Sequence, residues 1–419
     1  MRNAIAVLAI AISASLASAA DNWPQFRGPT GDGHSDATGL PPAWSETENV
    51  AWKTPIHDRG WSSPVVWENQ IWMTTATADG HRLFAVCVDR RTGKIVHDVK
   101  VFDVDEPEKI APINSYASPT PAIEAGRVYV HYGSYGTACL DTPTGKTLWQ
   151  RRDLKCDHHM GPGASPILHG DMLLFHVDGI DVQYVVALDK TTGKTAWKTD
   201  RSIDYTDVFP LCRKAFCTPT IIEVAGRTQM ISPGSKAVIA YDPTTGEELW
   251  KVRCFGWSMT PRPLFGHGLI YAIVDYDKPE LWAIRPASPQ APGGRGDVTD
   301  THVAWKVRQS MPSTPSLLLI DELLYMVNDD GVASCLEAKT GKVVWKERIG
   351  GNYSASPVYA DGRIYFSSQT SVTTAIAPGR EFKVLATSEL DDPVMASPAV
   401  AGNAIFLRTG THLYRIERR

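Results

Sequence analysis

The sequence predicts an all-β protein, an eight-bladed β-propeller of four-stranded antiparallel blades that is closed by an N-terminal strand. The 419 residues include 33 Gly, 29 Pro, 13 Trp and 14 Tyr, with short β-branched runs typical of strands joined by tight turns. A Ser/Thr-Pro pair recurs eight times ahead of an apolar run. The last repeat lacks its fourth strand, which an N-terminal segment can supply.

The start of the chain has the pattern of a secretory signal peptide. Arg2 is followed by an apolar run over residues 4–16 and by the small residues Ala17-Ser18-Ala19. The run is short for a membrane span, and polar residues follow it at once. We therefore expect residues 1–19 to be removed and residues 20–419 to form one exported propeller, in the periplasm or outside the cell, without an integral membrane segment.

The Ser/Thr-Pro pairs are 41 to 55 residues apart, which suits four short strands with their turns. Eight pairs predict eight blades. They are Ser63-Pro64, Ser118-Pro119, Ser165-Pro166, Thr218-Pro219, Thr260-Pro261, Thr314-Pro315, Ser356-Pro357 and Ser397-Pro398.

A second pattern ends most repeats with a tryptophan. In the third repeat Ala187 is followed by the turn Thr192-Gly193-Lys194 and by Trp197. Glycine supplies the turn, and the small residue leaves room for a large flat ring, so we expect these pairs to lock adjacent blades. The predicted docking tryptophans are Trp52, Trp149, Trp197, Trp250, Trp305 and Trp345.

Three repeats depart from this spacing. Cys87 leads to His97 and Ala375 leads to Leu385, so the aromatic ring is replaced or lost. Ala283 and Trp305 are farther apart in the sequence than the matching residues of the other repeats. The extra residues include the Pro- and Gly-rich stretch 286–300, which predicts a surface loop.

The chain ends predict how the ring closes. Residues 413–416 supply a third strand for the last repeat, and residues 50–53 have the pattern of the missing fourth strand. Residues 20–56 are therefore expected to form an N-terminal arm that includes the closing strand and leaves no open sheet edge.

The unit from Ala187 to Trp197 and its sister copies resemble the tryptophan-docking repeat of the pyrroloquinoline-quinone (PQQ) propellers. The resemblance covers nearly the whole mature chain and implies the eight-bladed fold. Members with this repeat include quinoprotein dehydrogenases and the non-enzymatic scaffold lipoprotein of the outer-membrane β-barrel assembly machinery. The stretches 22–29 and 296–305 resemble a third group, the exported planctomycete-type PQQ-like repeat proteins.

The resemblance allows an enzymatic hypothesis to be tested on residues. Quinoprotein alcohol dehydrogenases place two adjacent cysteines over the quinone and hold Ca²⁺ with Glu, Asn and Asp, whereas this sequence has no adjacent cysteine pair. Asp178, Asp275 and Asn328 are the candidates for a Ca²⁺ beside PQQ. The alternative interpretation is that such residues only make turns. We expect no cofactor and no metal, with PQQ and Ca²⁺ as the alternative.

Polar and aromatic residues precede several of the Ser/Thr-Pro strands, where the propeller model places the mouth of its channel. Such side chains suit a sugar, a peptide or a polar cofactor, although they could also fill the channel as core. Neighbouring histidines on an extended segment point to opposite sides, so a metal is not expected there. The predicted binding residues are Arg59, Trp61, Asn114, Tyr116, His158, His159, Lys214, Trp257 and Tyr353.

Seven cysteines are present, and most occupy small-residue positions of the repeat. Cys87, Cys139, Cys217 and Cys335 are expected to be buried thiols in different blades. One disulfide is possible among the rest, either Cys212 with Cys254 or Cys212 with Cys156.

The balance of charges and the motifs of the sequence exclude several classes of function. Lys and Arg number 42 against 46 Asp and Glu, so the chain lacks the basic excess that nucleic acid requires. Hydrolase and nucleotide-binding motifs are absent from the sequence. We predict an exported, non-enzymatic binding or scaffold propeller for an unknown protein or polar ligand, with peripheral envelope association possible. The alternative is a PQQ-dependent dehydrogenase acting on an alcohol or a sugar.

Overall fold

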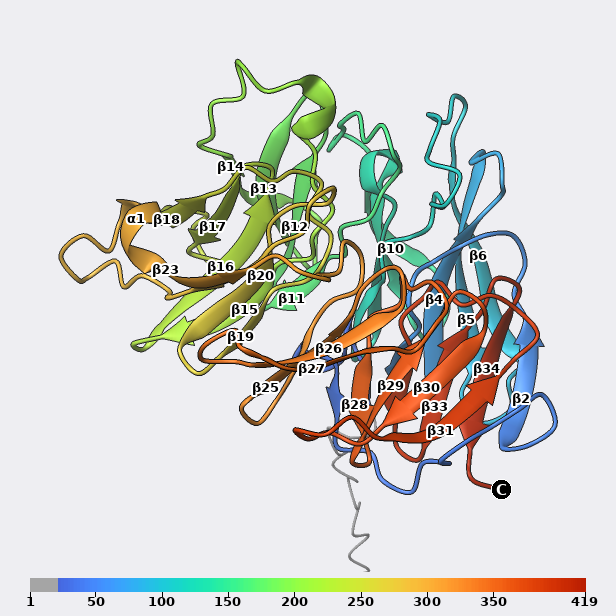
Figure 1. Cartoon of the computed structure of the whole chain (residues 1–419). Helices are drawn as coiled ribbons and strands as arrows, with labels where there is room; N and C mark the ends of the chain where they lie inside the picture. Colours follow the sequence, from blue (N-terminus) through green and yellow to red (C-terminus); the bar gives the residue numbers. More distant parts are fainter. Residues whose placement is uncertain (1–21) are drawn as a thin grey trace, which may run out of the picture.

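The computed structural model describes residues 22–419 and confirms the predicted fold, eight four-stranded blades arranged as a β-propeller (Figure 1). Successive strands within a blade pair antiparallel across short turns, so the chain completes most of one blade before it enters the next. The predicted signal peptide, residues 1–19, lies outside the described residues.

The first four blades follow one another along the chain. Blade 1 contains β3 (Val65–Trp67), β4 (Gln70–Ala76), β5 (Arg82–Asp89) and β6 (Ile95–Asp103). Blade 2 contains β7 (Ala122–Glu124), β8 (Arg127–His131), the short 3-10 helix η2 (Gly133–Tyr135), β9 (Thr137–Asp141) and β10 (Thr147–Arg151). Blade 3 contains β11 (Ile167–His169), β12 (Met172–Asp178), β13 (Gln183–Asp189) and β14 (Thr195–Asp200). After η3 (Pro210–Cys212), blade 4 contains β15 (Thr220–Val224), β16 (Arg227–Gly234), β17 (Ala237–Tyr241) and β18 (Glu248–Arg253).

The other four blades complete the ring. Blade 5 contains β19 (Leu264–Gly266), β20 (Leu269–Ile273), β21 (Leu281–Ile284) and β23 (Val303–Val307). Blade 6 contains β24 (Leu318–Ile320), β25 (Leu323–Val327), β26 (Val332–Glu337) and β27 (Val343–Arg348). Blade 7 contains β28 (Val358–Ala360), β29 (Arg363–Ser367), β30 (Val372–Ile376) and β31 (Val384–Glu389), with β1 (His34–Ser35) added beside β28. Blade 8 contains β32 (Ala399–Ala401), β33 (Ala404–Arg408), β34 (His412–Glu417) and β2 (Val50–Pro55).

Burial decreases from the central strands of a blade to its outermost strand. The interior of β13 is buried because neighbouring blades cover both faces of the sheet. In β14, at the outer edge of the same blade, exposed side chains alternate with half-buried ones. This difference explains why the central strands have continuous apolar sequences and the outermost strands carry Thr, Lys and Asp.

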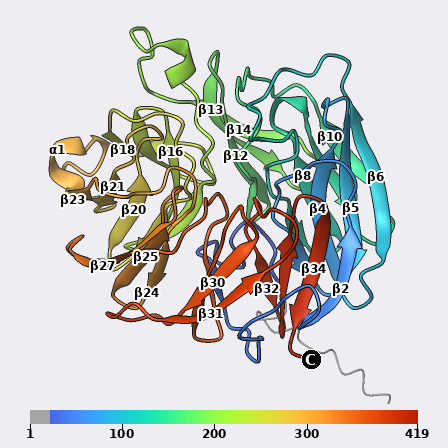
Figure 2. The ribbon, with the colours of Figure 1, turned by 45° about the vertical axis from the view of Figure 1, so that its right-hand side comes forward.

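The ring closes as the chain ends predict. Strand β2 pairs antiparallel with β34, with Lys53 opposite Tyr414 and Thr54 opposite Leu413. The blue N-terminal strand lies beside the red C-terminal strand (Figure 2). Lys53 Nζ and Tyr414 Oη both donate to the Glu46 carboxylate, at 2.9 and 2.8 Å, which ties the arm to the last strand.

The repeat tryptophans lie on outermost strands and contact the next blade. Trp197 pairs with Ala187 inside blade 3, while its indole N–H donates to the carbonyl of Pro243 in blade 4 at 3.1 Å. A Cβ at Gly246, whose φ is +75°, would collide with the Trp197 ring. The small residue therefore makes room within the blade, and the glycine turn makes the contact between blades.

The other predicted docking residues follow this arrangement with one exception. Trp52, Trp149 and Trp305 lie against Gly93, Gly193 and Gly341 of the following blades, and Trp345 donates to the carbonyl of Gly379. Trp250 instead donates to Gln229 of its own blade at 2.8 Å, because blade 5 has no equivalent glycine turn to receive it.

Part of the predicted surface loop at 286–300 is regular structure. Strand β22 (Gly296–Asp297) pairs parallel with β18 and extends the sheet of blade 4, and the short helix α1 (Thr299–His302) follows it. Trp250, on β18, is fully buried. The sequence did not reveal this edge because a two-residue strand has no periodicity to detect.

The structure refines the repeat in four blades. In the other blades the first strand begins two residues after the hydroxyl residue of the Ser/Thr-Pro pair, whereas in three it begins four residues after Ser118, Thr260 or Thr314. Thr120, Arg262 and Ser316 then stand two residues ahead of these three strands. These segments carry a second Pro or hydroxyl residue, so the pattern offers two registers. In blade 7 a bulge skips Leu385, and Ala375 pairs with Ala386.

Candidate functional site

The central channel holds a cavity of about 380 Å³ to which all eight blades contribute side chains. Its wall is formed by the segments that lead into the first strand of each blade. Aromatic and apolar residues are Phe26, Trp61, Ile113, Met160, Phe216, Trp257, Tyr276 and Met395, and the polar residues include Asn114, Lys214, Ser258 and Asp277.

Hydroxyl groups lie around the cavity, a set that we call the hydroxyl ring, and hydrogen bonds through them link blades 1 to 4 and blades 5 to 8. The backbone N–H of Ser63 donates to Thr120 Oγ1 at 3.0 Å, and Thr120 N–H donates to Ser165 Oγ at 2.9 Å. Further round, Ser316 N–H donates to Ser356 Oγ at 3.0 Å and Ser356 N–H to Ser397 Oγ at 2.8 Å. In the pairs Ser165-Pro166, Thr218-Pro219, Ser356-Pro357 and Ser397-Pro398 the hydroxyl satisfies a backbone donor of the preceding blade, which gives the pattern a physical cause there.

The N-terminal arm closes one end of this cavity with Phe26. Trp23 exchanges two backbone hydrogen bonds of 2.8 Å with Val66 in blade 1, and Pro24 accepts one from Ile123 in blade 2. On the opposite side, the Phe26 carbonyl accepts from Arg262 Nη1 at 2.6 Å. Because these contacts reach blades on both sides of the channel, the cavity opens toward the loops at the other end.

Arg27 anchors the arm to blades 6 and 7. Its guanidinium donates to the carbonyls of Leu317 and Pro357 and to that of Asp32 within the arm. A Cβ at Gly33 would collide with this group, so the arm needs glycine there. Burial lowers the pKa of Arg27 to about 9 and that of Arg262 to about 10, and both remain charged at neutral pH.

Four of the nine predicted binding residues line the cavity, namely Trp61, Asn114, Lys214 and Trp257. The Trp61 indole N–H donates to the Ile113 carbonyl at 2.8 Å, which fixes the ring at the mouth. The Asn114 amide donates to the carbonyls of Met160 and Pro162, so it joins the loops of blades 2 and 3.

The other five predicted residues lie elsewhere. Arg59 and Tyr116 line a separate hollow of about 310 Å³ beside the 109–112 loop. His158 is buried and its Nε2 accepts the N–H of Ser134 at 2.9 Å, while His159 is exposed with φ +59°. Tyr353 is buried in the apolar core of blades 6 and 7. Alternating side-chain directions and the left-handed turn at His159 separate these residues from their cavity-lining neighbours.

Sequence reasoning missed Phe26, Ser258 and the hydroxyl ring. The recurring Ser/Thr-Pro pairs were the signal for the ring, but they indicated only strand starts. Nothing in the pattern of residues 22–29 indicated that the arm crosses the channel, because its contacts are to segments hundreds of residues away.

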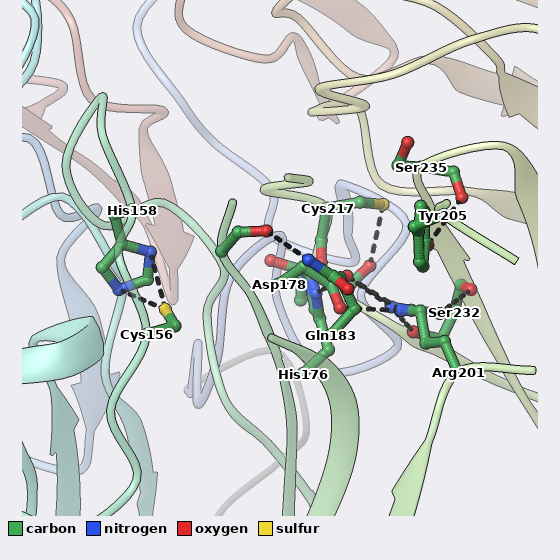
Figure 3. Close-up of polar contacts among 12 residues, drawn as sticks. Cys156, His158, His176, Asp178, Gln183, Arg201, Tyr205, Cys217, Ser232 and Ser235 are labelled. Carbon is green, nitrogen blue, oxygen red and sulfur yellow. Dashed lines mark hydrogen bonds and ion pairs between the residues drawn. The ribbon is translucent and has the colours of Figure 1, made fainter. Parts of the chain in front are cut away.

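Asp178, a candidate Ca²⁺ ligand in the dehydrogenase alternative, is enclosed in an ion-pair cluster (Figure 3). Its carboxylate accepts from Arg201 Nε and Nη2 at 2.8 and 2.7 Å, and it lies 2.6 Å from His176 Nδ1. Burial alone would raise the pKa of Asp178, but the charge of Arg201 lowers it. This arrangement stabilises the interior between blades 3 and 4 and leaves Asp178 without an open coordination position.

The other two candidates make turns. Asp275 accepts the backbone N–H groups of Tyr276 and Asp277, and Asn328 accepts that of Val332 at 2.8 Å. Within residues 22–419, no group of three or more His, Cys, Asp or Glu side chains is placed to hold a metal ion.

All seven cysteines lie in the described part of the chain and are free thiols, so the disulfide considered for Cys212 does not form. Cys156 packs against His158, with Sγ 3.4 Å from Nδ1. Cys87, Cys139, Cys217 and Cys335 are buried, as predicted.

Eight blades, of which four place an outer tryptophan against the glycine turn of the next blade, define the class of PQQ-like repeat β-propellers. A family model described as "Outer membrane protein assembly factor BamB" matches residues 40–199 and 181–419. The chain belongs to this family.

Two curated relatives match parts of the chain. Quinoprotein ethanol dehydrogenase of Pseudomonas aeruginosa is 29% identical over 171 residues, which are 36% of this chain and 27% of that enzyme. Outer membrane protein assembly factor BamB of Moranella endobia is 26% identical over 199 residues, 43% of this chain and 46% of that protein. The matched segments thus span less than half the length of either relative.

Solved structures share the fold. BamB from Moraxella catarrhalis superposes with a TM-score of 0.60 at 13% identity, covering 88% of this chain and 99% of that one. The quinohemoprotein alcohol dehydrogenase of Comamonas testosteroni gives 0.68 at 11% identity, covering 96% and 81%. At such identities the likeness concerns the fold alone. Among the described residues, no helix has the length and apolarity to cross a membrane.

Proposed function

We propose that this protein is an exported, non-enzymatic binding module that takes a protein partner or a polar ligand at the mouth of its central channel. The observation that supports this function is the cavity of about 380 Å³ built from all eight blades and closed at one end by Phe26. Concave sites of this size, mainly apolar with a few polar groups, are typical of binding sites.

The entrance of the cavity carries exposed apolar side chains. Ile113 is 57% exposed, Tyr276 42% and Met160 40%, and all three line the cavity. Apolar side chains gathered at a hollow are typical of interaction surfaces, since scattered exposed residues would not share one rim.

The second candidate is a PQQ-dependent dehydrogenase, favoured by the similarity to quinoprotein ethanol dehydrogenase. If PQQ bound here, Trp257 and the wall hydroxyls would hold it, and it would supply the two-electron oxidation of an alcohol or a sugar. The carboxylates expected to hold Ca²⁺ beside it do not fit, because Asp178 is paired with Arg201 and Asp275 caps its own turn.

A crosslinking experiment tests the binding function. A photoreactive amino acid at Ile113 should give a discrete crosslinked product in cells, whereas the same group at Leu148 should not. Leu148 is a matched control because it is apolar and 48% exposed but lies on the outermost strand of blade 2. Equal products from both positions, or none from Ile113, would contradict a binding mouth.

The enzymatic alternative has its own measurement. Purified protein is titrated calorimetrically with PQQ in the presence of Ca²⁺ and then assayed for dye reduction with alcohols and sugars. The expected result is no substrate-dependent reduction. Reduction that depends on PQQ would replace the proposed function with the dehydrogenase.

A further inference from the structure

Lys214 is a buried cation at the cavity wall and forms no ion pair with the described part of the chain. The residue is 1% exposed, and its Nζ donates to the carbonyl of Leu211 and lies 5.0 Å from the centre of the Trp257 ring. No carboxylate among residues 22–419 forms an ion pair with it. A buried ammonium is costly unless a negative group is close, so an anion at this wall would stabilise it.

Ser258 supplies a second, independent observation beside Lys214. Ser258 lines the cavity, and its buried Oγ has no hydrogen-bond partner among residues 22–419. Its backbone has φ +51°, a left-handed conformation that is unfavourable for serine, and its N–H donates to the Lys214 carbonyl at 2.9 Å. The fold therefore places an unsatisfied hydroxyl and an ammonium without a carboxylate partner on two residues that are joined through their backbones and line the same cavity, and one acceptor-rich group there could satisfy both.

The rest of the wall offers further donors. Six hydroxyl groups of the ring accept a backbone N–H, and each retains its own O–H for donation. Within residues 22–419 these O–H groups have no acceptor. They belong to Thr120, Ser165, Thr218, Ser316, Ser356 and Ser397.

The charges around the channel also favour an anion. Arg27 and Arg262 lie beneath the cavity, and their hydrogen bonds go to carbonyl and hydroxyl oxygens. In the described chain neither forms a carboxylate ion pair. Lys214, Arg27 and Arg262 thus bring three positive charges to the cavity, against the carboxylates of Asp277 on the wall and Asp32 near the two arginines, in a protein whose net charge is −4.

We propose that the cavity binds a polyhydroxylated monocarboxylic acid of the sugar-acid class, with its carboxylate on Lys214 and Ser258 and its ring oxygens facing the hydroxyl ring. A single carboxylate is specified because Lys214 is the one cation that the described residues place on the wall, and Asp277 shares that wall. The size of the cavity suits a small molecule. The inference rests on the proposed function, because this site lies in the same cavity, below the mouth at which that function places the partner or ligand.

Calorimetric titration of the mature protein with glucuronate, glucose and benzoate tests the inference. Glucuronate should bind more tightly than glucose, which lacks the carboxylate, and more tightly than benzoate, which lacks the hydroxyls. Inorganic phosphate is the fourth probe, since stronger binding of phosphate would identify a general anion site in place of a sugar-acid site and overturn the proposal.

Variants separate the two parts of the site. Lys214→Met should weaken glucuronate binding about 10- to 100-fold, in line with loss of a hydrogen bond to a charged group, and leave glucose binding unchanged. Ser258→Ala should weaken glucuronate less. Lys236→Met is the matched control, because Lys236 Nζ also donates to a carbonyl, that of Phe255, at 2.6 Å but does not line the cavity.

Melting without ligand distinguishes a binding lysine from a structural one. Lys214→Met should melt no lower than the parent, because it removes a buried charge that lacks a carboxylate partner. A markedly lower melting temperature, or an unchanged preference for glucuronate in Lys214→Met and Ser258→Ala, would overturn the inference. Absence of glucuronate binding would also overturn it, while crosslinking at Ile113 would still decide the proposed function.

Discussion

At the scale of single residues, blades 2 and 3 enclose two histidines that burial keeps neutral. Burial lowers the pKa of His131 to about 3 and that of His158 to about 4, against an ordinary value of 6.5. His158 Nε2 accepts a backbone hydrogen bond from Ser134, which a protonated ring could not do. Acid should therefore destabilise the interface between blades 2 and 3, where both histidines are buried.

The sign of the effect follows from proton binding. Above pH 6.5 both histidines are neutral whether the chain is folded or unfolded, so their contribution to stability is complete. Below pH 6.5 only the unfolded chain takes up these protons, and each histidine lowers the free energy of unfolding by up to about 1.4 kcal/mol per pH unit until its folded-state pKa is reached.

Denaturant unfolding at pH 7.5 and pH 5.0 measures this loss. His158→Gln keeps an acceptor for Ser134 but cannot take up a proton, so it should reduce the difference between the two pH values. His159→Gln is the control, since His159 is exposed beside it. If the stability of His158→Gln depended on pH as strongly as that of the parent, His158 would not be a source of the acid sensitivity.

At the scale of elements, the contact between an outermost strand and the next glycine turn joins the blades. Trp197→Ala should lower the free energy of unfolding by about 2–3 kcal/mol, somewhat less than the roughly 3–5 kcal/mol for a fully enclosed ring, because Trp197 is only half-buried. Chemical denaturation measures this loss of unfolding free energy. Leu148→Ala is the control, because it shortens an exposed apolar side chain on the same kind of strand, and it should lower the free energy of unfolding by less than about 0.5 kcal/mol. Equal losses in the two variants would mean that the Trp197 ring does not dock on the next blade.

The sequence predicted those elements whose signal is local and repeated. The turn-and-tryptophan pattern identified β13 and β14 because the glycine and the ring are only a few residues apart. The Ser/Thr-Pro pairs located the first strand of every blade, but they did not indicate that Thr120, Arg262 and Ser316 directly precede three of these strands, since two neighbouring hydroxyl or proline positions satisfy the same pattern. Strand β22 was missed because its only support is a parallel pairing with β18.

The candidate site was predictable only in part, for a similar reason. Lys214 and Trp257 were identified because they lie in segments that lead into the first strand of a blade, and these segments line the cavity. Tyr353 was included wrongly among the mouth residues, because a shift of one residue decides whether a side chain faces the channel or the core. Phe26 could not be found from spacing, since the path of the arm depends on contacts with Arg262.

At the scale of the whole molecule, closure depends on residues that are far apart in the sequence. The hydroxyl ring passes hydrogen bonds from blade 1 to blade 4 and from blade 5 to blade 8. The arm bonds to blades on opposite sides of the channel, and β2 covers the edge of β34. Each of these contacts contributes little stability alone. Loss of β2, however, would expose the edge of β34 and release the N-terminal arm at the same time. Stability should therefore depend on residues 22–56 more than on any single contact.

Deletion of residues 22–56 should lower the melting temperature severely and broaden the transition, because blade 8 loses its outermost strand and the cavity loses Phe26. Differential scanning calorimetry measures both effects. A synthetic peptide of residues 22–56 added in trans should restore part of the loss, since its backbone can pair with β34, whereas a scrambled peptide of the same composition should not. If the truncated chain melted as sharply and as high as the parent, the strand pairing would be dispensable, and the blades would be held by the tryptophan contacts alone.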